Sequence, residues 1–160
     1  PFINWSEAEK GIMWGMMFLF AGGLALGKLI IATGAAGKLA EYITLLPLDG
    51  GFGTILAFNL FSGLMTEISS NTAAAAIVIP IVQNILQKLS LNPIPYIYIS
   101  IVAVNCAYIL PVSIRAIPVS YGLNPEIMLR YGIILSLSTI LITSVIGFLF
   151  MQYFPLFSTL

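Results

Sequence analysis

The chain has 160 residues, of which 59% are apolar and only 8% charged. Soluble domains carry about 25% charged residues, so this composition excludes an ordinary soluble fold. Long stretches contain no charge at all, among them residues 11–27, 68–87, 89–114 and 131–160, with 17, 20, 26 and 30 residues. Because about 20 apolar residues cross a bilayer, the sequence predicts an all-α, multi-pass membrane protein.

The same composition excludes several classes of function. A net charge of zero without a basic cluster indicates no nucleic-acid partner. Histidine is absent, which removes Ser/His and Cys/His nucleophilic catalysis, the HExxH zinc motif and histidine proton relays. Asp49 is the only aspartate, whereas an intramembrane aspartyl protease needs two, and the single Cys106 lies in an apolar run that favours simple burial. We therefore expect no enzyme activity and no resident cofactor.

The first elements in chain order are a long helix and a short one. Residues 11–32 form a predicted transmembrane helix, with Trp14 suited to the membrane interface and Lys28 able to snorkel near the far end. Residues 35–47 carry apolar side chains at helical spacing among charged ones. This pattern predicts a short amphipathic helix at the interface that ends at Pro47.

The next stretch is apolar but interrupted. From Gly50 to Gln87 the sequence runs for 38 residues, too long for one span, and the polar segment 66–72 lies near its middle. Irregular polar backbone at membrane depth is tolerated only where protein buries it or where it lines a cavity. The sequence therefore predicts a re-entrant hairpin over 51–88, with two half-membrane helices that meet at a polar tip over 66–72.

The residues of this tip suit ions of both signs. Ser69, Ser70, Asn71 and Thr72 precede four alanines, a pattern typical of a capped helix start whose free amides attract an anion. Carbonyls at the end of the first arm, with nearby hydroxyl and amide oxygens, suit a small hard cation. The same four residues also fit the plain cap of an ordinary helix, and spacing alone leaves both interpretations open.

The remainder of the chain predicts one broken and one continuous helix. A discontinuous helix is expected over 96–122, interrupted over 111–118, where two prolines flank Arg115. A last transmembrane helix is expected over 129–154. The polar tip occurs once, whereas transporters are usually built from two repeats. Residues 1–160 are therefore predicted to be a single membrane domain, one inverted-repeat half of a transporter whose N-terminal half is missing here.

Three segments, in this order, resemble the divalent anion/sodium symporter family, whose members carry dicarboxylates and sulfate. Residues 65–81, MTEISSNTAAAAIVIPI, are similar to the second SNT hairpin of that family. Residues 14–43, WGMMFLFAGGLALGKLIIATGAAGKLAEYI, resemble its tryptophan- and glycine-rich span with the helix that follows. Residues 105–122, NCAYILPVSIRAIPVSYG, fall where its second discontinuous helix lies. The match covers nearly the whole chain, as the family's C-terminal half.

The resemblance implies a secondary active transporter of di- or tricarboxylates or sulfate. It implies an elevator mechanism, in which a moving domain holds the anion between two hairpin tips with a sodium ion at each, so Na⁺ is the expected coupling ion. It further implies an integral multi-pass protein of the plasma membrane that forms a homodimer within the lipid bilayer. The resemblance assigns the substrate contact to the SNT residues Ser70, Asn71 and Thr72. It assigns the oxygen ligands of one sodium ion to Thr66, Ser69, Asn71 and Ser113.

One departure from the family concerns the broken helix. The family usually shows Thr-Pro-Pro-Asn-Ala after Leu-Pro-Val, whereas here Val112 is followed by Ser-Ile-Arg-Ala. The departure leaves open whether this loop keeps its substrate contact and its sodium site. Arg115 fits two interpretations, a side chain that snorkels to the interface or a permanent cation that pairs with the anion and replaces a coupling ion. Glu67 either balances a sodium ion or a proton, or faces an aqueous vestibule.

Two alternatives to sodium-coupled transport remain at this stage. The first is a proton-coupled or exchange-type anion permease, similar to arsenite permeases, in which Glu67 rather than sodium carries the coupling. The second is a degenerate membrane paralogue that transports nothing, which the altered loop over 113–115 favours. Sodium dependence separates the first alternative from a symporter, and a silent Asn71→Ala variant would favour the second.

Overall fold

The computed structural model describes most of the chain after residue 44. The described residues are 4–12, 14–15, 17–18, 21–22, 25, 29, 32–35, 38, 41–42 and 45–154. Every regular element among them is helical, beginning with α1 (Trp5–Gly11). About half of the residues in the helices predicted over 11–32 and 35–47 lie outside the described residues.

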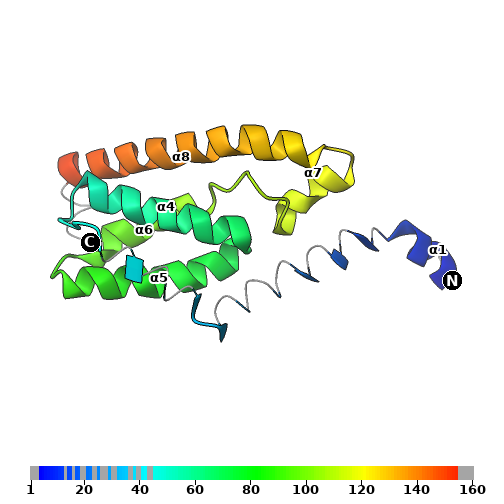
Figure 1. The fold of residues 1–160 in the computed structure, drawn as a ribbon, viewed down its shortest axis with the longest axis horizontal. Helices are drawn as coiled ribbons and strands as arrows, with labels where there is room; N and C mark the ends of the chain where they lie inside the picture. The colour runs from blue at the N-terminus through cyan, green and yellow to red at the C-terminus, as the bar shows by residue number, and fades with distance from the viewer. Residues whose placement is uncertain are drawn as a thin grey trace.

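Two helices, α4 (Phe52–Ile68) and α5 (Asn71–Lys88), form an antiparallel hairpin (Figure 1). They occupy the segment for which the sequence predicts a hairpin. Only two residues, Ser69 and Ser70, separate them. The hydroxyl of Ser70 caps α5 by accepting a hydrogen bond from the amide of Ala73 at 3.2 Å. The turn between the arms is therefore short, and both helix ends lie at it.

The broken helix starts and breaks earlier than the sequence suggests. Helix α6 (Pro93–Val104) begins three residues before the predicted residue 96, because Asn92 caps the amide of Ile94 at 3.1 Å and a proline fits the first helical position. The chain then leaves the helix over 105–112 and continues as η1 (Ser113–Arg115) and α7 (Ala116–Ser120). The break predicted over 111–118 is therefore displaced, since it starts at Asn105 and α7 resumes within the predicted range.

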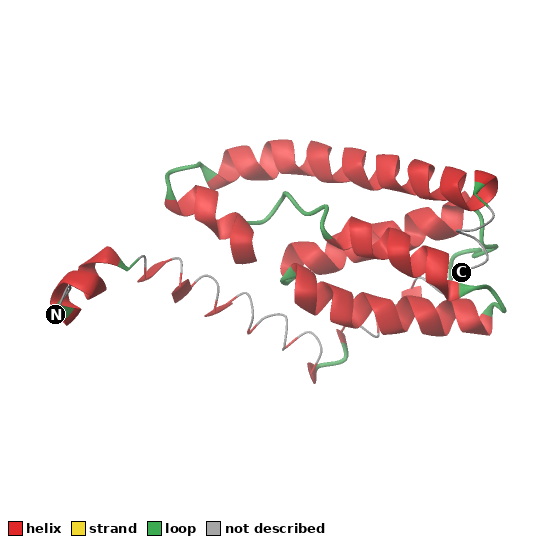
Figure 2. Cartoon of the chain, turned by 180° about the vertical axis from the view of Figure 1, so that it is seen from behind, coloured by secondary structure: helices red, strands yellow, loops and turns green. Residues whose placement is uncertain are grey.

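The last element, α8 (Pro125–Tyr153), runs the length of the bundle (Figures 1 and 2). It begins at 125 rather than 129, because the side chain of Asn124 accepts from the amide of Glu126 at 2.9 Å. It has 29 residues and a mean hydropathy of 2.4 over its most apolar 18 residues, and it alone among the described helices is long and apolar enough to cross a membrane. Helices α4 and α6 are apolar but shorter, which suits segments that end within a bilayer.

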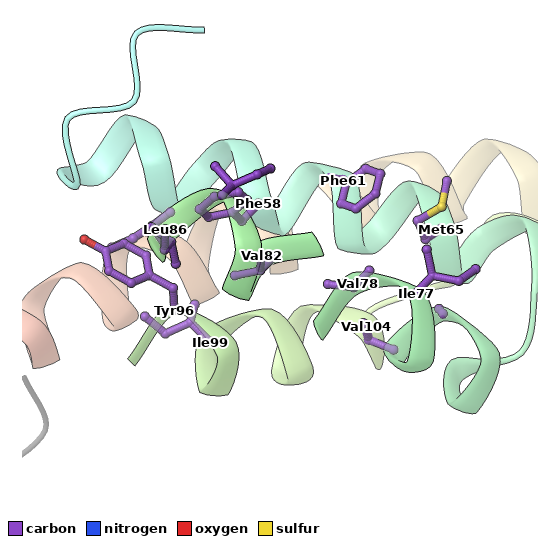
Figure 3. Packing of buried hydrophobic residues seen from close by; sticks show 13 residues of the cluster. Phe58, Phe61, Met65, Ile77, Val78, Val82, Leu86, Tyr96, Ile99 and Val104 are labelled. Carbon is purple, nitrogen blue, oxygen red and sulfur yellow. The ribbon is translucent and has the colours of Figure 1, made fainter. Parts of the chain in front are cut away.

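The core lies where the hairpin meets α6. Helices α4, α5 and α6 contact one another in pairs, and α8 packs against α4 and α6. The buried residues come from α4, α5 and α6 and interleave between these three helices (Figure 3). Phe58 and Tyr96 meet edge to face, with ring centroids 6.3 Å apart. The largest fully buried apolar members of the core are Ile55, Phe58, Met65, Val78, Val82, Leu86 and Val104.

Small residues on α8 let it approach the rest of the bundle closely. Its buried positions are Gly132, Ser136, Ile140, Ser144 and Gly147. A Cβ atom added at Gly132 would lie only 2.2 Å from the carbonyl oxygen of Tyr108, so this position requires glycine. Close approach through small residues is typical of helices packed in membranes, where lipid removes the hydrophobic driving force between them.

Candidate functional site

The tip of the hairpin brings two unlike helix ends together. Helix α4 ends at Ile68 with carbonyl groups that lack partners in the helix, and α5 begins at Asn71 with free amides. The first end carries a partial negative charge and the second a partial positive charge. A pair of such ends favours a cation on one side and an anion on the other.

Asn71 connects the three segments that meet at the tip. Its Oδ1 accepts a hydrogen bond from the hydroxyl of Thr66 on α4 at 2.8 Å, and its Nδ2 donates to Oδ1 of Asn105 at 3.1 Å. The Nδ2 of Asn105 donates in turn to the carbonyl of Ile101 at 2.9 Å. Because a carbonyl oxygen can only accept, this bond fixes the orientation of the side-chain amide of Asn105. The bond between the two asparagines then fixes the orientation of the side-chain amide of Asn71. The oxygen of Asn71 therefore points to Thr66.

The other predicted tip residues differ in exposure. Thr66 and Ser69 are buried, with 0% and 1% of their surface exposed. The hydroxyl of Ser69 turns back to the carbonyl of Met65 at 2.7 Å, whereas Thr72 lies exposed on the first turn of α5. The structure thus brings Thr66, Ser69, Ser70 and Asn71 together at the tip. Ser113 lies apart from them in sequence, at the start of η1.

Glu67 is turned inward, toward the break in the neighbouring helix. The residue is 6% exposed, so the interpretation in which it faces an aqueous vestibule is wrong. Its carboxylate accepts hydrogen bonds from the backbone amides of Tyr108 at 2.8 Å, Ile109 at 3.1 Å and Leu110 at 3.0 Å. The hydroxyl of Ser136 on α8 donates to the same carboxylate at 3.1 Å. One acidic side chain therefore satisfies three consecutive amides that belong to no helix.

Arg115 reaches in the opposite direction, from the broken helix to the end of α4. Its Nη2 donates to the carbonyl of Thr66 at 2.8 Å and to that of Glu67 at 3.4 Å, and its Nε donates to the carbonyl of Leu110 at 3.0 Å. The side chain is partly buried and does not snorkel away from the bundle. A permanent positive charge thus lies on the carbonyl end of α4, within the set of oxygens predicted for sodium.

Two residues of this network were not singled out from the sequence. Asn105 is an amide within an apolar stretch, at the point where α6 stops, and that placement is a usable sequence feature. Ser136 carries no such feature. Several hydroxyls of α8 bond to their own helix, as Ser138 does to the carbonyl of Ile134 at 2.7 Å. Nothing in the sequence distinguishes Ser136 from them.

A polar hairpin tip beside a broken helix, set among apolar helices, is the architecture of a membrane transporter. The family model described as citrate transporter matches residues 1–103. The chain belongs to this citrate transporter family, which confirms the predicted resemblance.

Named relatives point to the same class. The chain is 35% identical, over 120 residues, to a sodium-dependent dicarboxylate transporter of Staphylococcus saprophyticus, covering 75% of this chain and 23% of that protein. It is 32% identical to the sodium-dependent dicarboxylate transporter of Staphylococcus aureus, with the same coverage. An uncharacterised transporter of Haemophilus influenzae is 30% identical over 155 residues, 92% of this chain and 33% of that protein. The chain therefore spans 23% to 33% of the length of these relatives.

Proposed function

We propose that this chain is the C-terminal repeat of a secondary active transporter that carries di- or tricarboxylates or sulfate, coupled to sodium. The observation that carries the proposal is the bridge through Asn71, which holds the carbonyl end of α4, the amide end of α5 and the broken helix at one point. The names of the relatives, which specify sodium-dependent dicarboxylate transport, support the same substrate class.

The substrate side of this site is the first turn of α5. Ser70, Asn71 and Thr72 offer hydroxyl and amide groups beside the positive end of the helix, an arrangement that favours a carboxylate or sulfate oxygen. Thr72 is exposed and Ser70 and Asn71 are partly exposed, so an anion can approach them. The four alanines that follow present no bulk against it.

The cation side of the site is the end of α4. Thr66 and Asn71 already place two side-chain oxygens 2.8 Å apart, and Ser69 and Ser113 add backbone or side-chain oxygens in the proposed sodium set. Carbonyl ends of interrupted helices coordinate sodium in secondary transporters. In this proposal sodium neutralises the carbonyl end while the anion binds the amide end, which couples the two.

The whole transporter adds parts that this chain does not supply. An N-terminal repeat contributes the second hairpin tip, and the two repeats together move the bound anion by an elevator mechanism. We further propose that the protein is an integral multi-pass protein of the plasma membrane, works in a lipid bilayer and forms a homodimer. Only 22% of the most apolar 18-residue stretch of α8 is buried. The exposed remainder is available for contact with lipid or with those parts.

Uptake of labelled succinate into proteoliposomes tests the proposal, using the full-length transporter that contains this repeat. We expect an inward sodium gradient to stimulate uptake and Asn71→Ala to reduce it at least about tenfold, because two hydrogen bonds at the tip are lost. The matched control is Asn84→Ala, which alters an exposed asparagine of the same helix. Equal uptake by both variants would contradict the role of Asn71, and absence of uptake in the wild type as well would favour a paralogue that transports nothing.

A second candidate function, anion exchange, is favoured by the position of Arg115. Its guanidinium already lies on the carbonyl of Thr66 at 2.8 Å, where the first candidate requires a sodium ion. A guanidinium is always charged and donates in fixed directions, so it can replace a metal cation at a cluster of oxygens. A carrier of this kind would exchange one anion for another without sodium at this tip.

Arg115→Gln distinguishes the exchanger from the symporter. For an exchanger, we expect wild-type uptake to need anion inside the vesicle and to ignore sodium. The variant, which loses the fixed charge, should then exchange about tenfold more slowly or become sodium-dependent. Arg130→Gln, at an exposed arginine of α8, is the control. An Arg115→Gln variant with unchanged rate and unchanged ion dependence would exclude the exchange candidate.

A further inference from the structure

The break between α6 and α7 contains backbone amides that no backbone carbonyl satisfies. Residues 105–112 are not helical, yet Ala107 is buried and residues 108–110 are only partly exposed. In a membrane protein each backbone amide needs a hydrogen-bond partner inside the protein, because lipid provides none. The amides of Tyr108, Ile109 and Leu110 find that partner in a side chain of another helix.

Glu67 supplies both of its carboxylate oxygens to this segment. Its Oε1 accepts from the amide of Tyr108 at 2.8 Å and from Ser136 at 3.1 Å, and its Oε2 accepts from the amide of Leu110 at 3.0 Å. The amide of Ile109 lies between, 3.1 Å from each oxygen. Hydrogen bonds from neutral donors to a charged acceptor are among the stronger ones in proteins.

A second contact joins the same two segments in the opposite direction, because the positive side chain of Arg115, which follows the break, contacts the end of α4. Leu110 donates its amide to Glu67 and accepts with its carbonyl from Nε of Arg115 at 3.0 Å. Nη2 of Arg115 also donates to the carbonyl of Thr66, the residue before Glu67, at 2.8 Å. The end of α4 and the broken helix are thus tied in both directions by side chains of opposite charge.

We propose that Glu67 is a positioning residue of the transport site, a fixed anion that determines where the broken helix lies against the hairpin tip. Asn105, whose Oδ1 holds Nδ2 of Asn71, lies only three residues before the first amide that Glu67 binds. A shift of the break therefore moves Asn105 and, through it, Asn71. This effect on transport rests on the proposed function, whereas the effect on the break itself does not.

The geometry separates this role from that of a proton carrier. The three backbone amides around Glu67 can only donate, so they require acceptor oxygens. A protonated carboxylic acid has a hydrogen to donate on one oxygen and would lose part of these bonds in every cycle. Positioning by a fixed charge needs no such change.

Two measurements on Glu67→Gln test the proposal, and Ser138→Ala, at an exposed serine of α8 that bonds its own helix, is the control. Glutamine has the same shape but turns a donor toward an amide, so we expect the KM for succinate to rise about tenfold while folded yield is retained. Cys106, which is 9% exposed and lies beside the break, should react faster with a maleimide by a similar factor. Mass spectrometry of the peptide that contains Cys106 reports this rate. Ser138→Ala leaves every hydrogen bond of Glu67 in place and should change both values less than about twofold.

The outcomes distinguish the alternatives. Unchanged protection of Cys106 in Glu67→Gln would overturn the proposal. An unchanged KM together with loss of uptake driven by a pH gradient would also overturn it, in favour of a proton carrier. Faster labelling of Cys106 in a protein that transports no carboxylate or sulfate would support the positioning of the break and contradict the proposed function instead. Where Glu67→Gln fails to fold, Glu67→Asp keeps two oxygens on a shorter stem, and intermediate changes of both values are expected.

Discussion

The two ends of the hairpin are held together by different kinds of interaction. At the end away from the tip, Phe58 and Leu86 from the two arms pack with Tyr96 of α6, all nearly or fully buried (Figure 3). At the tip, side-chain hydrogen bonds join Thr66, Asn71 and Asn105 instead. Apolar packing accepts many side chains of suitable volume, whereas a hydrogen bond needs a particular donor and acceptor. The first end therefore stabilises the bundle, and the second end has the chemical selectivity that a binding site requires.

The largest effect is expected from the packed end. Phe58→Ala would leave a cavity at a site that is 1% exposed, and such truncations cost about 3–5 kcal/mol. Thermal unfolding in detergent should show this loss, while the KM for succinate of the surviving folded protein stays unchanged. Leu64→Ala, at an exposed leucine of the same helix, is the control and should be near neutral. A raised KM in Phe58→Ala would break the distinction between the two ends.

An intermediate effect is expected where α8 touches the break. Gly132→Ala would place a methyl group 2.2 Å from the carbonyl oxygen of Tyr108, and overpacking costs about 1–3 kcal/mol. Because the contact lies at the broken helix, this variant should lower the melting temperature and raise the KM together. Gly53→Ala adds a methyl group into open space and serves as its control. If only stability changes, α8 supports the bundle without influencing the tip.

The smallest effect is expected at a polar contact away from the tip. Asn59 donates to the hydroxyl of Ser144 at 2.9 Å, and both side chains are fully buried between α4 and α8. Ser144→Ala should cost about 0.6–1.7 kcal/mol, the range found for such bonds in membranes, with no change of KM. Ser138→Ala, at an exposed serine that bonds its own helix, is the reference. A change of substrate affinity in Ser144→Ala would extend the site into the bundle.

Local sequence patterns account for much of the fold. Ser70, which the sequence predicts to precede a capped helix start, accepts the amide hydrogen bond of a cap. Asn92 and Asn124 also cap their helices, although the sequence predicts these helices to start later, at 96 and 129. The polar tip between two apolar arms could likewise be located from its sequence, because such a segment is tolerated at membrane depth only where protein buries it or where it lines a cavity. These features depend on neighbours within a few residues, so the sequence displays them directly.

The position of the break could not be read in this way. Two prolines suggested a start at 111, yet the chain leaves the helix at Asn105, because Glu67, 41 residues before Tyr108, satisfies the amides that follow. The partner of Arg115 was equally hidden, since the carbonyl of Thr66 lies 49 residues away along the chain. Contacts over such distances depend on how the helices pack, and no local spacing encodes them.

The three amides held by Glu67 have a consequence for experiments that follow deuterium uptake. Exchange of an amide hydrogen requires its hydrogen bond to open, and it is slow wherever that opening is costly, whether or not the residue belongs to a helix. The amides of Tyr108, Ile109 and Leu110 are bound as firmly as those of a helix, although their segment is irregular. A map of deuterium uptake would therefore show slow exchange at residues 108–110, within the interruption between α6 and α7, where an irregular segment would otherwise be expected to exchange fast.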